Sequence, residues 1–90
     1  MNDYRAHIEE QRKDLAFSAE WERQRPEREC IKAIIAARME QNLTQKELAE
    51  RTGIRQSNIS RIENGNCSPT IATLQQIAAG VGKTLYIEFR

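Results

Sequence analysis

Residues 43–65, LTQKELAERTGIRQSNISRIENG, contain two short helical patterns separated by a glycine. Thr44 followed three residues later by Glu47 is typical of a capping box, in which the hydroxyl and the carboxylate each satisfy a first-turn backbone donor. Gly53 can supply the left-handed residue that ends the first helix. The two predicted helices run from Gln45 to about Arg51 and from near Arg55 to Asn64–Gly65. Their expected inward residues are Leu48, Ala49, Ile54, Ile59 and Ile62.

Two further helices are predicted around this pair. The first begins at about Pro26, because a first-turn proline lacks only an orphan N–H, and a break at Asn42–Leu43 ends it. Its inward face comprises Ile31, Ile34, Ile35 and Arg38. The last is capped by residues 68–70 and ended by Gly80 and Gly82. Its apolar stripe comprises Ile71, Leu74, Ile77, Ala78 and Val81.

The final segment, residues 84–90, alternates between two faces and therefore has the period of a strand. A single strand cannot satisfy its own hydrogen-bonding ladder, and no other strand is predicted in the chain. It must pair with a second copy, pair with another protein, or not form. We expect a dimer, with contacts from Leu85, Tyr86, Ile87 and Phe89.

The composition excludes several classes of protein. The 90 residues have the length of one domain, and no apolar run approaches the roughly 20 residues that span a bilayer. The N-terminus lacks the apolar stretch of a secretory signal, so a cytoplasmic location is expected. Cys30, Cys67 and a single histidine are too few for a disulfide scaffold or a zinc site. Since no nucleophile–base motif or phosphate-binding glycine loop occurs, we expect no enzyme, metal or cofactor.

The third predicted helix carries a polar face that suits nucleic acid. At about 100° per residue, its polar residues cluster roughly opposite Ile59 and Ile62, and none of them is acidic. Glutamine can pair with adenine and arginine with guanine in a major groove, while the first residues of the preceding helix would meet a phosphate. The candidate DNA-binding residues are Gln45, Lys46, Arg55, Gln56, Ser57, Ser60, Arg61 and Asn64. The alternative is that this face is only a solvated surface.

Residues 43–65 resemble the helix-turn-helix of the Xre/Cro family of phage and bacterial repressors. Leu43-Thr44-Gln45, Glu47-Leu48-Ala49, Gly53, Ile59-Ser60 and Ile62-Glu63-Asn64-Gly65 all match that pattern. The resemblance implies an all-α, lambda-repressor-like bundle, here with an N-terminal helical arm and a C-terminal β-strand. It also implies that Asn64 meets the DNA backbone and that Arg38 and Glu63 form a largely buried ion pair.

The N-terminal part, residues 13–41, resembles HigA-type antitoxins of type II toxin–antitoxin systems, as does the closing Gly-Lys-x-Leu-x-Ile-x-Phe pattern. The resemblance implies a small, basic RelE/HigB-like toxin that cleaves mRNA, which the chain neutralises while it represses its own operon. Residues 1–30 carry a net charge of −2, against +2 for residues 31–69, and an acidic arm suits a basic partner. The candidate toxin-binding residues are Phe17, Trp21, Leu15, Tyr4 and Ile8.

The sequence therefore predicts three parts: an arm over residues 1–25 that binds toxin, a helix-turn-helix domain over 26–83, and a dimerising strand over 84–90. The dimer would read an inverted repeat in double-stranded operator DNA. Two alternatives remain. One is a stand-alone Xre-type repressor with no toxin partner, whose arm contacts its own bundle or a small molecule. The other is an interaction module that has lost DNA binding.

Overall fold

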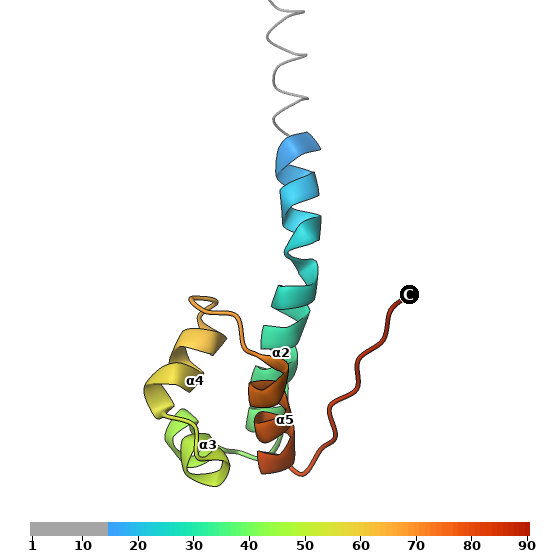
Figure 1. Cartoon of the computed structure of the whole chain (residues 1–90). Helices are drawn as coiled ribbons and strands as arrows, with labels where there is room; N and C mark the ends of the chain where they lie inside the picture. Colours follow the sequence, from blue (N-terminus) through green and yellow to red (C-terminus); the bar gives the residue numbers. More distant parts are fainter. Residues whose placement is uncertain (1–14) are drawn as a thin grey trace, which may run out of the picture.

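The structure, a computed structural model, describes residues 15–90 of the chain. It contains four helices that form a bundle: α2 (Arg25–Glu40), α3 (Gln45–Thr52), α4 (Gln56–Glu63) and α5 (Ile71–Gly80). Residues 15–23 are also helical and extend the line of α2 away from the bundle (Figure 1). The predicted order of helices is therefore confirmed, and the described residues place an arm on one side of a compact helical domain.

The core lies where the four bundle helices meet. Leu48, Ile59 and Ile62 are fully buried, so α3 and α4 contribute its centre. The remaining buried apolar residues are Ile34, Leu43, Ile77 and Val81. Most of these are positions that the helical spacing assigned to the inside. Ile71 was also expected on the inside but is 60% exposed, because it is the first residue of α5 and lies at the edge of the bundle.

Two threonines cap helices with their side chains. Thr44 Oγ1 accepts a hydrogen bond from the Glu47 N–H at 3.1 Å, and the Thr44 N–H donates to Glu47 Oε1 at 3.2 Å. The predicted capping box of α3 is thus present. Thr70 caps α5 with its side chain alone, because its hydroxyl accepts from the Thr73 N–H at 3.1 Å. Gly53 closes α3 with a φ of +76°, the left-handed conformation that favours glycine.

Gly80 is the last residue of α5, ahead of the turn at residues 81–82, as the sequence predicted. It also has a packing role that the sequence did not reveal. A Cβ atom built on it would lie 2.5 Å from Cγ2 of Thr52, so α3 and α5 approach each other too closely for any side chain there. Glycine is needed at this position for helix packing, while Gly82, with a φ of +70°, makes the following turn.

The predicted strand over residues 84–90 is not formed in the single chain. The structure assigns no strand to any of residues 15–90. The start of the segment is anchored, because Lys83 Nζ lies 2.9 Å from Glu40 Oε2 and the Lys83 N–H donates to Ala78 O at 2.8 Å. Beyond that point the chain runs clear of the bundle (Figure 1), and Phe89 is 98% exposed. The physical reason is that no neighbouring strand offers the backbone partners that a ladder requires.

The arm and α2 are joined by helical hydrogen bonds. The Gln24 N–H donates to Glu20 O at 3.2 Å and the Arg28 N–H to Gln24 O at 3.1 Å. Pro26 therefore lies in the first turn of a helix that continues from a preceding one, where its missing N–H is tolerated. None of the helices in the described residues is long and apolar enough to span a bilayer.

Candidate nucleic-acid interface

The polar face of α4 points away from the core. Ile59 and Ile62 bury the opposite face of the same helix, which fixes its rotation about its own axis. Of the predicted contact residues on α4, Ser60 is half-buried and the others are exposed: Gln56, Ser57 and Arg61, with Asn64 at the helix end. The only acidic residue of α4 is Glu63, whose side chain is 5% exposed. The exposed face consequently offers amides, hydroxyls and a guanidinium without any carboxylate that would repel phosphate.

The Glu63 carboxylate joins three helices beneath this face. Its two oxygens accept from Arg38 on α2, with Nε–Oε2 at 2.9 Å and Nη2–Oε1 at 2.8 Å. The remaining Nη1 of Arg38 donates to Leu43 O at 2.8 Å, in the connection between α2 and α3. Such a side-on pair fixes both planes and is stronger than a single contact. It ties the orientation of α4 to α2 and to the start of α3.

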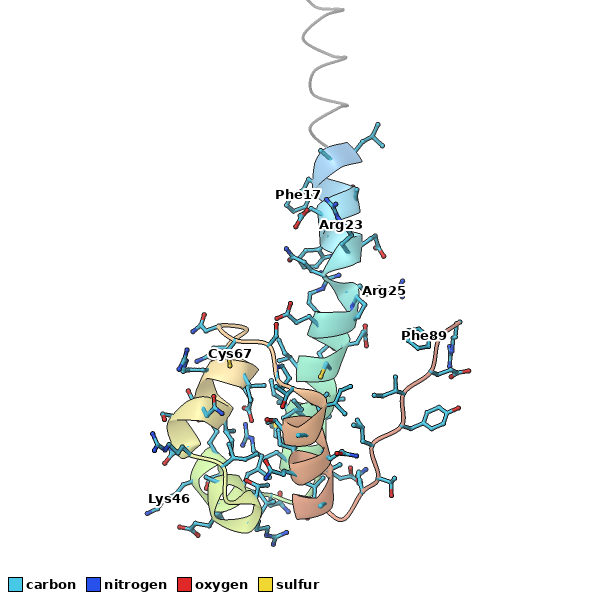
Figure 2. All side chains as sticks on the ribbon, viewed as in Figure 1. Phe17, Arg23, Arg25, Lys46, Cys67 and Phe89 are labelled. Atoms are coloured by element: carbon cyan, nitrogen blue, oxygen red, sulfur yellow. The ribbon has the colours of Figure 1, made fainter. Side chains whose placement is uncertain are left out.

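Gln45 belongs to the same network, which its position in the sequence did not reveal. Its Nε2 donates to Glu63 Oε1 at 3.2 Å, and the residue is half-buried. The side chain therefore has one amide end engaged with the protein and can present its remaining groups outward. Lys46, the neighbouring candidate, is exposed and projects from the start of α3 (Figure 2). Gln45 therefore lies beside the last residue of α4, and Lys46 adds an exposed cation at the start of α3.

A hollow of about 450 Å³ lies between α4 and α5. It is lined by Gly53, Ile54, Arg55, Ser57, Asn58, Arg61, Thr73 and Gln76. Three of these residues, Arg55, Ser57 and Arg61, are predicted DNA contacts. Thr73 and Gln76 are new, and their only signal in the sequence is a three-residue spacing that places both on one side of α5.

The helical segment 15–23 carries exposed aromatic side chains. The rings of Phe17 and Trp21 are nearly parallel, with centroids 6.4 Å apart. The guanidinium of Arg28 lies 3.5 Å from the centroid of the Trp21 ring, and its Nη1 donates to Trp21 O at 2.6 Å. Phe17 is 69% exposed and Leu15 is also exposed, so an apolar surface faces solvent here. Tyr4 and Ile8, the other two candidates for toxin binding, lie outside the described residues.

The two cysteines are half-buried and do not form a disulfide. Burial and the nearby Glu27 carboxylate raise the pKa of the Cys30 thiol above its ordinary value. Cys67 makes a weak contact with Asn58 Oδ1 at 3.9 Å. In residues 15–90 no group of three or more His, Cys, Asp or Glu side chains could hold a metal ion.

Comparison with known proteins matches the helical bundle to a family. The sequence model described as helix-turn-helix matches residues 34–86, which include α3, α4, α5 and the C-terminal part of α2. An uncharacterised HTH-type transcriptional regulator of Haemophilus influenzae is 40% identical over 57 residues, 63% of this chain and 58% of that protein. One from Sinorhizobium fredii is 40% identical over 45 residues, 50% of this chain and 58% of that protein.

A third relative, an uncharacterised HTH-type transcriptional regulator of Methanothermobacter thermautotrophicus, is 41% identical over 46 residues. The match spans 51% of this chain and 67% of that protein. The chain thus spans somewhat more than half the length of the first two relatives. No solved structure matches the chain significantly.

Proposed function

The chain belongs to the helix-turn-helix family, and on that premise we propose that it is a DNA-binding transcriptional repressor that places α4 in the major groove of operator DNA. The observation that carries the proposal is the exposed, carboxylate-free face of α4, held in position by the ion pair between Arg38 and Glu63. The relatives named as HTH-type transcriptional regulators support the same role.

The residues of this face have different tasks. Gln56 can pair with the N6 and N7 positions of adenine and Arg61 with O6 and N7 of guanine, since both side chains present two groups in the required geometry. Ser57 and Ser60 are short enough to let the helix approach the base edges. Gln45, Lys46, Arg55 and Asn64 would meet the sugar-phosphate backbone and set the register of the helix on the duplex.

Binding to duplexes tests this proposal directly. A 30-base-pair duplex is selected from a random library by the full chain, and fluorescence anisotropy then compares the wild type with the double variant Gln56→Ala, Arg61→Ala. Loss of the two base contacts is expected to weaken binding by at least about tenfold. Gln75→Ala, an exposed change of the same residue type on α5, is the matched control. Unchanged affinity of the double variant would favour an interaction module without DNA binding.

We also propose that residues 84–90 dimerise the protein. The segment is extended, unpaired in the single chain, and exposes Tyr86, Ile87 and Phe89. Pairing with the same segment of a second copy would satisfy its backbone and cover these side chains, and the dimer would read an inverted repeat. Sedimentation at micromolar concentration is expected to give a dimer, and a chain truncated after Lys83 a monomer. A monomeric full chain would exclude this pairing.

The exposed aromatic surface at residues 15–23 supports an antitoxin role for the arm. Phe17 and Trp21 are the kind of side chain that anchors interfaces, and both are exposed to solvent. Phe17 lies on the helical extension beyond the bundle, where a partner can reach it (Figure 2). We propose that this surface, with the net acidic charge of residues 1–30, binds a small basic RelE/HigB-like toxin. The alternative function is a stand-alone Xre-type repressor that has no such partner.

Affinity capture from the native lysate distinguishes these two functions. The full chain and a truncation that starts at Gln24 are compared, and any small basic protein captured by the full chain alone is purified and assayed for mRNA cleavage. Inhibition of that cleavage by the full chain, and not by the Phe17→Ala, Trp21→Ala variant, would support the antitoxin role. Recovery of only the chain and DNA from both forms would favour the stand-alone repressor.

A further inference from the structure

The hollow between α4 and α5 has the lining of an anion site. Six of its eight lining residues are polar, two of these are arginines, and none is acidic. It is open to solvent along the same side of α4 that carries Ser57 and Arg61. A charged ligand could therefore enter without displacing the core, which lies behind Ile54.

The two arginines of the hollow have no acidic partner within residues 15–90. The ion pairs in this part of the chain involve other side chains, and neither Arg55 nor Arg61 donates a side-chain hydrogen bond there. This differs from Arg38, which has all of its contacts inside the protein. Two positive charges on one rim raise the local potential and favour a negatively charged ligand.

The remaining lining groups are mainly donors. Ser57 supplies a hydroxyl and Gln76 an amide that has no hydrogen-bond partner among the described residues. Asn58 uses its oxygen to accept weakly from the Cys67 thiol, which leaves its amide N–H groups to donate. Guanidinium forks combined with neutral donors match the oxygens of an anionic group such as phosphate.

The position of the hollow relative to α4 favours a phosphate of the DNA backbone. Gln45 reaches Glu63 at the C-terminal end of α4. The hollow is lined mostly by residues 53–58, at and before the N-terminal half of α4, with Arg61 one turn farther along. An eight-residue helix is about 12 Å long, close to the width of about 12 Å of a major groove. Groups at the two ends of α4 can therefore meet the two opposite sugar-phosphate backbones.

We propose that the hollow between α4 and α5 binds a backbone phosphate of the operator, with Gln76 and Thr73 of α5 as contact residues in addition to those of the helix-turn-helix. This inference rests on the proposed DNA binding and deepens it. It makes α5 part of the DNA interface and gives the complex two groups of phosphate-contacting residues. One group contains Gln45 and Lys46, and the other contains Arg55, Thr73 and Gln76.

Charge substitutions at two adjacent glutamines test the proposal. Gln76→Glu and Gln76→Lys are compared with Gln75→Glu and Gln75→Lys, because both residues are exposed on α5 and only Gln76 lines the hollow. Affinity for the selected duplex is measured by anisotropy in the full chain over a series of salt concentrations. Circular dichroism checks that each variant folds.

Gln76→Glu is expected to weaken binding about fivefold and Gln76→Lys to strengthen it by a similar factor. The lysine should also steepen the slope of log affinity against log salt by about 0.9, the value for one additional phosphate contact. The Gln75 variants should change the affinity by less than about twofold at physiological salt, where the Debye length is about 8 Å, and should leave the salt slope unchanged.

Equal effects at the two positions would overturn the proposal while leaving DNA binding by α4 intact. A selected duplex whose affinity is unaffected by Gln56→Ala, Arg61→Ala would instead overturn the proposed function and the present inference with it. Titration of the isotope-labelled chain with sodium phosphate identifies a different source. Saturable shifts at Thr73 and Gln76 that duplex does not displace would assign the hollow to free phosphate and overturn the operator contact.

Discussion

Arg38 and Glu63, which are 25 residues apart in the chain, meet side-on with N–O distances of 2.9 and 2.8 Å. Their side chains are 16% and 5% exposed, so the pair is largely withdrawn from water. Separating the two side chains would require both to be rehydrated or left unpaired, so the pair opposes movement of α2 relative to α4. It connects the long helix α2, which carries the arm, to α4, which carries the proposed reading face.

Replacing Glu63 with alanine is expected to lower the free energy of unfolding by about 3–5 kcal/mol, because it leaves the Arg38 guanidinium without its carboxylate in a part-buried place. Urea unfolding followed by circular dichroism measures the change. The control is Glu40→Ala, which breaks the exposed pair with Lys83 and should cost less than about 1 kcal/mol. Similar losses for the two variants would show that the inner pair contributes no more than a surface pair.

Gly80→Ala is expected to destabilise the bundle by about 1–3 kcal/mol, because the new methyl group would overlap Cγ2 of Thr52. The Thr52 side chain cannot rotate away cheaply, since its hydroxyl donates to Leu48 O at 2.8 Å. Thermal unfolding measures the loss. The double variant Gly80→Ala, Thr52→Ser removes the overlapping methyl group while it keeps the hydroxyl, and should recover most of the stability. Absence of recovery would place the cost of the alanine elsewhere.

Thr44→Ala removes the cap of α3 and should cost about 1 kcal/mol of stability. Helix α3 begins at the next residue, so the same change should loosen the first turn that carries Gln45 and Lys46. Hydrogen exchange at the Glu47 amide, which donates to the Thr44 hydroxyl in the wild type, reports the change at a single site. Thr44→Ser keeps a hydroxyl acceptor and serves as the control that should retain protection of this amide.

The capping box also predicts a dependence of stability on pH. Hydrogen bonds from the Thr44 backbone and side chain hold the pKa of the Glu47 carboxyl below its ordinary value. Because the pKa is lowered in the folded state, the contribution to stability is present above the unfolded pKa and is lost as pH falls through the folded pKa. Unfolding midpoints measured from neutral to acid pH should therefore decline less steeply for Glu47→Gln. Parallel curves for the variant and the wild type would contradict the prediction.

Trp21 is the only tryptophan of the chain, so its fluorescence reports directly on the contact with Arg28. Arg28→Ala should shift the emission to longer wavelength, because the ring loses the guanidinium that covers one face. It should also reduce helicity of residues 15–23, since the Trp21 carbonyl loses the hydrogen bond that Arg28 donates. Arg25→Ala is the control, as Arg25 pairs with Glu22 and not with the ring. An emission spectrum that changes equally in both variants would exclude a specific role for Arg28.

The local features of the chain are readable from the sequence because each depends on neighbours a few residues away. The capping box of Thr44 and Glu47, the left-handed Gly53 and the inward positions of Ile59 and Ile62 all follow from spacing within one or two turns. The same local pattern orients the polar residues of α4. This is why the order of helices and the candidate reading face could be predicted without coordinates.

Other features depend on which helices become neighbours. Gly80 has the sequence context of a helix end, yet its role is set by Thr52 of another helix. Thr73 and Gln76 acquire their proposed role only because α5 lies across the hollow from α4. The bond between Gln45 and Glu63 likewise joins residues 18 positions apart.

Residues 84–90 show that a strand pattern in the sequence is not enough to form a strand. Alternation specifies which side chains would share a face, but a strand forms only when another strand supplies its hydrogen bonds. Within the single chain no such partner is present for residues 15–90, and the segment stays extended and exposed. The backbone hydrogen bonds of a helix form within one segment, so the helices of this protein could be predicted from local sequence. The contacts between helices, and any pairing of the tail, depend on surfaces that exist only once the chain has folded.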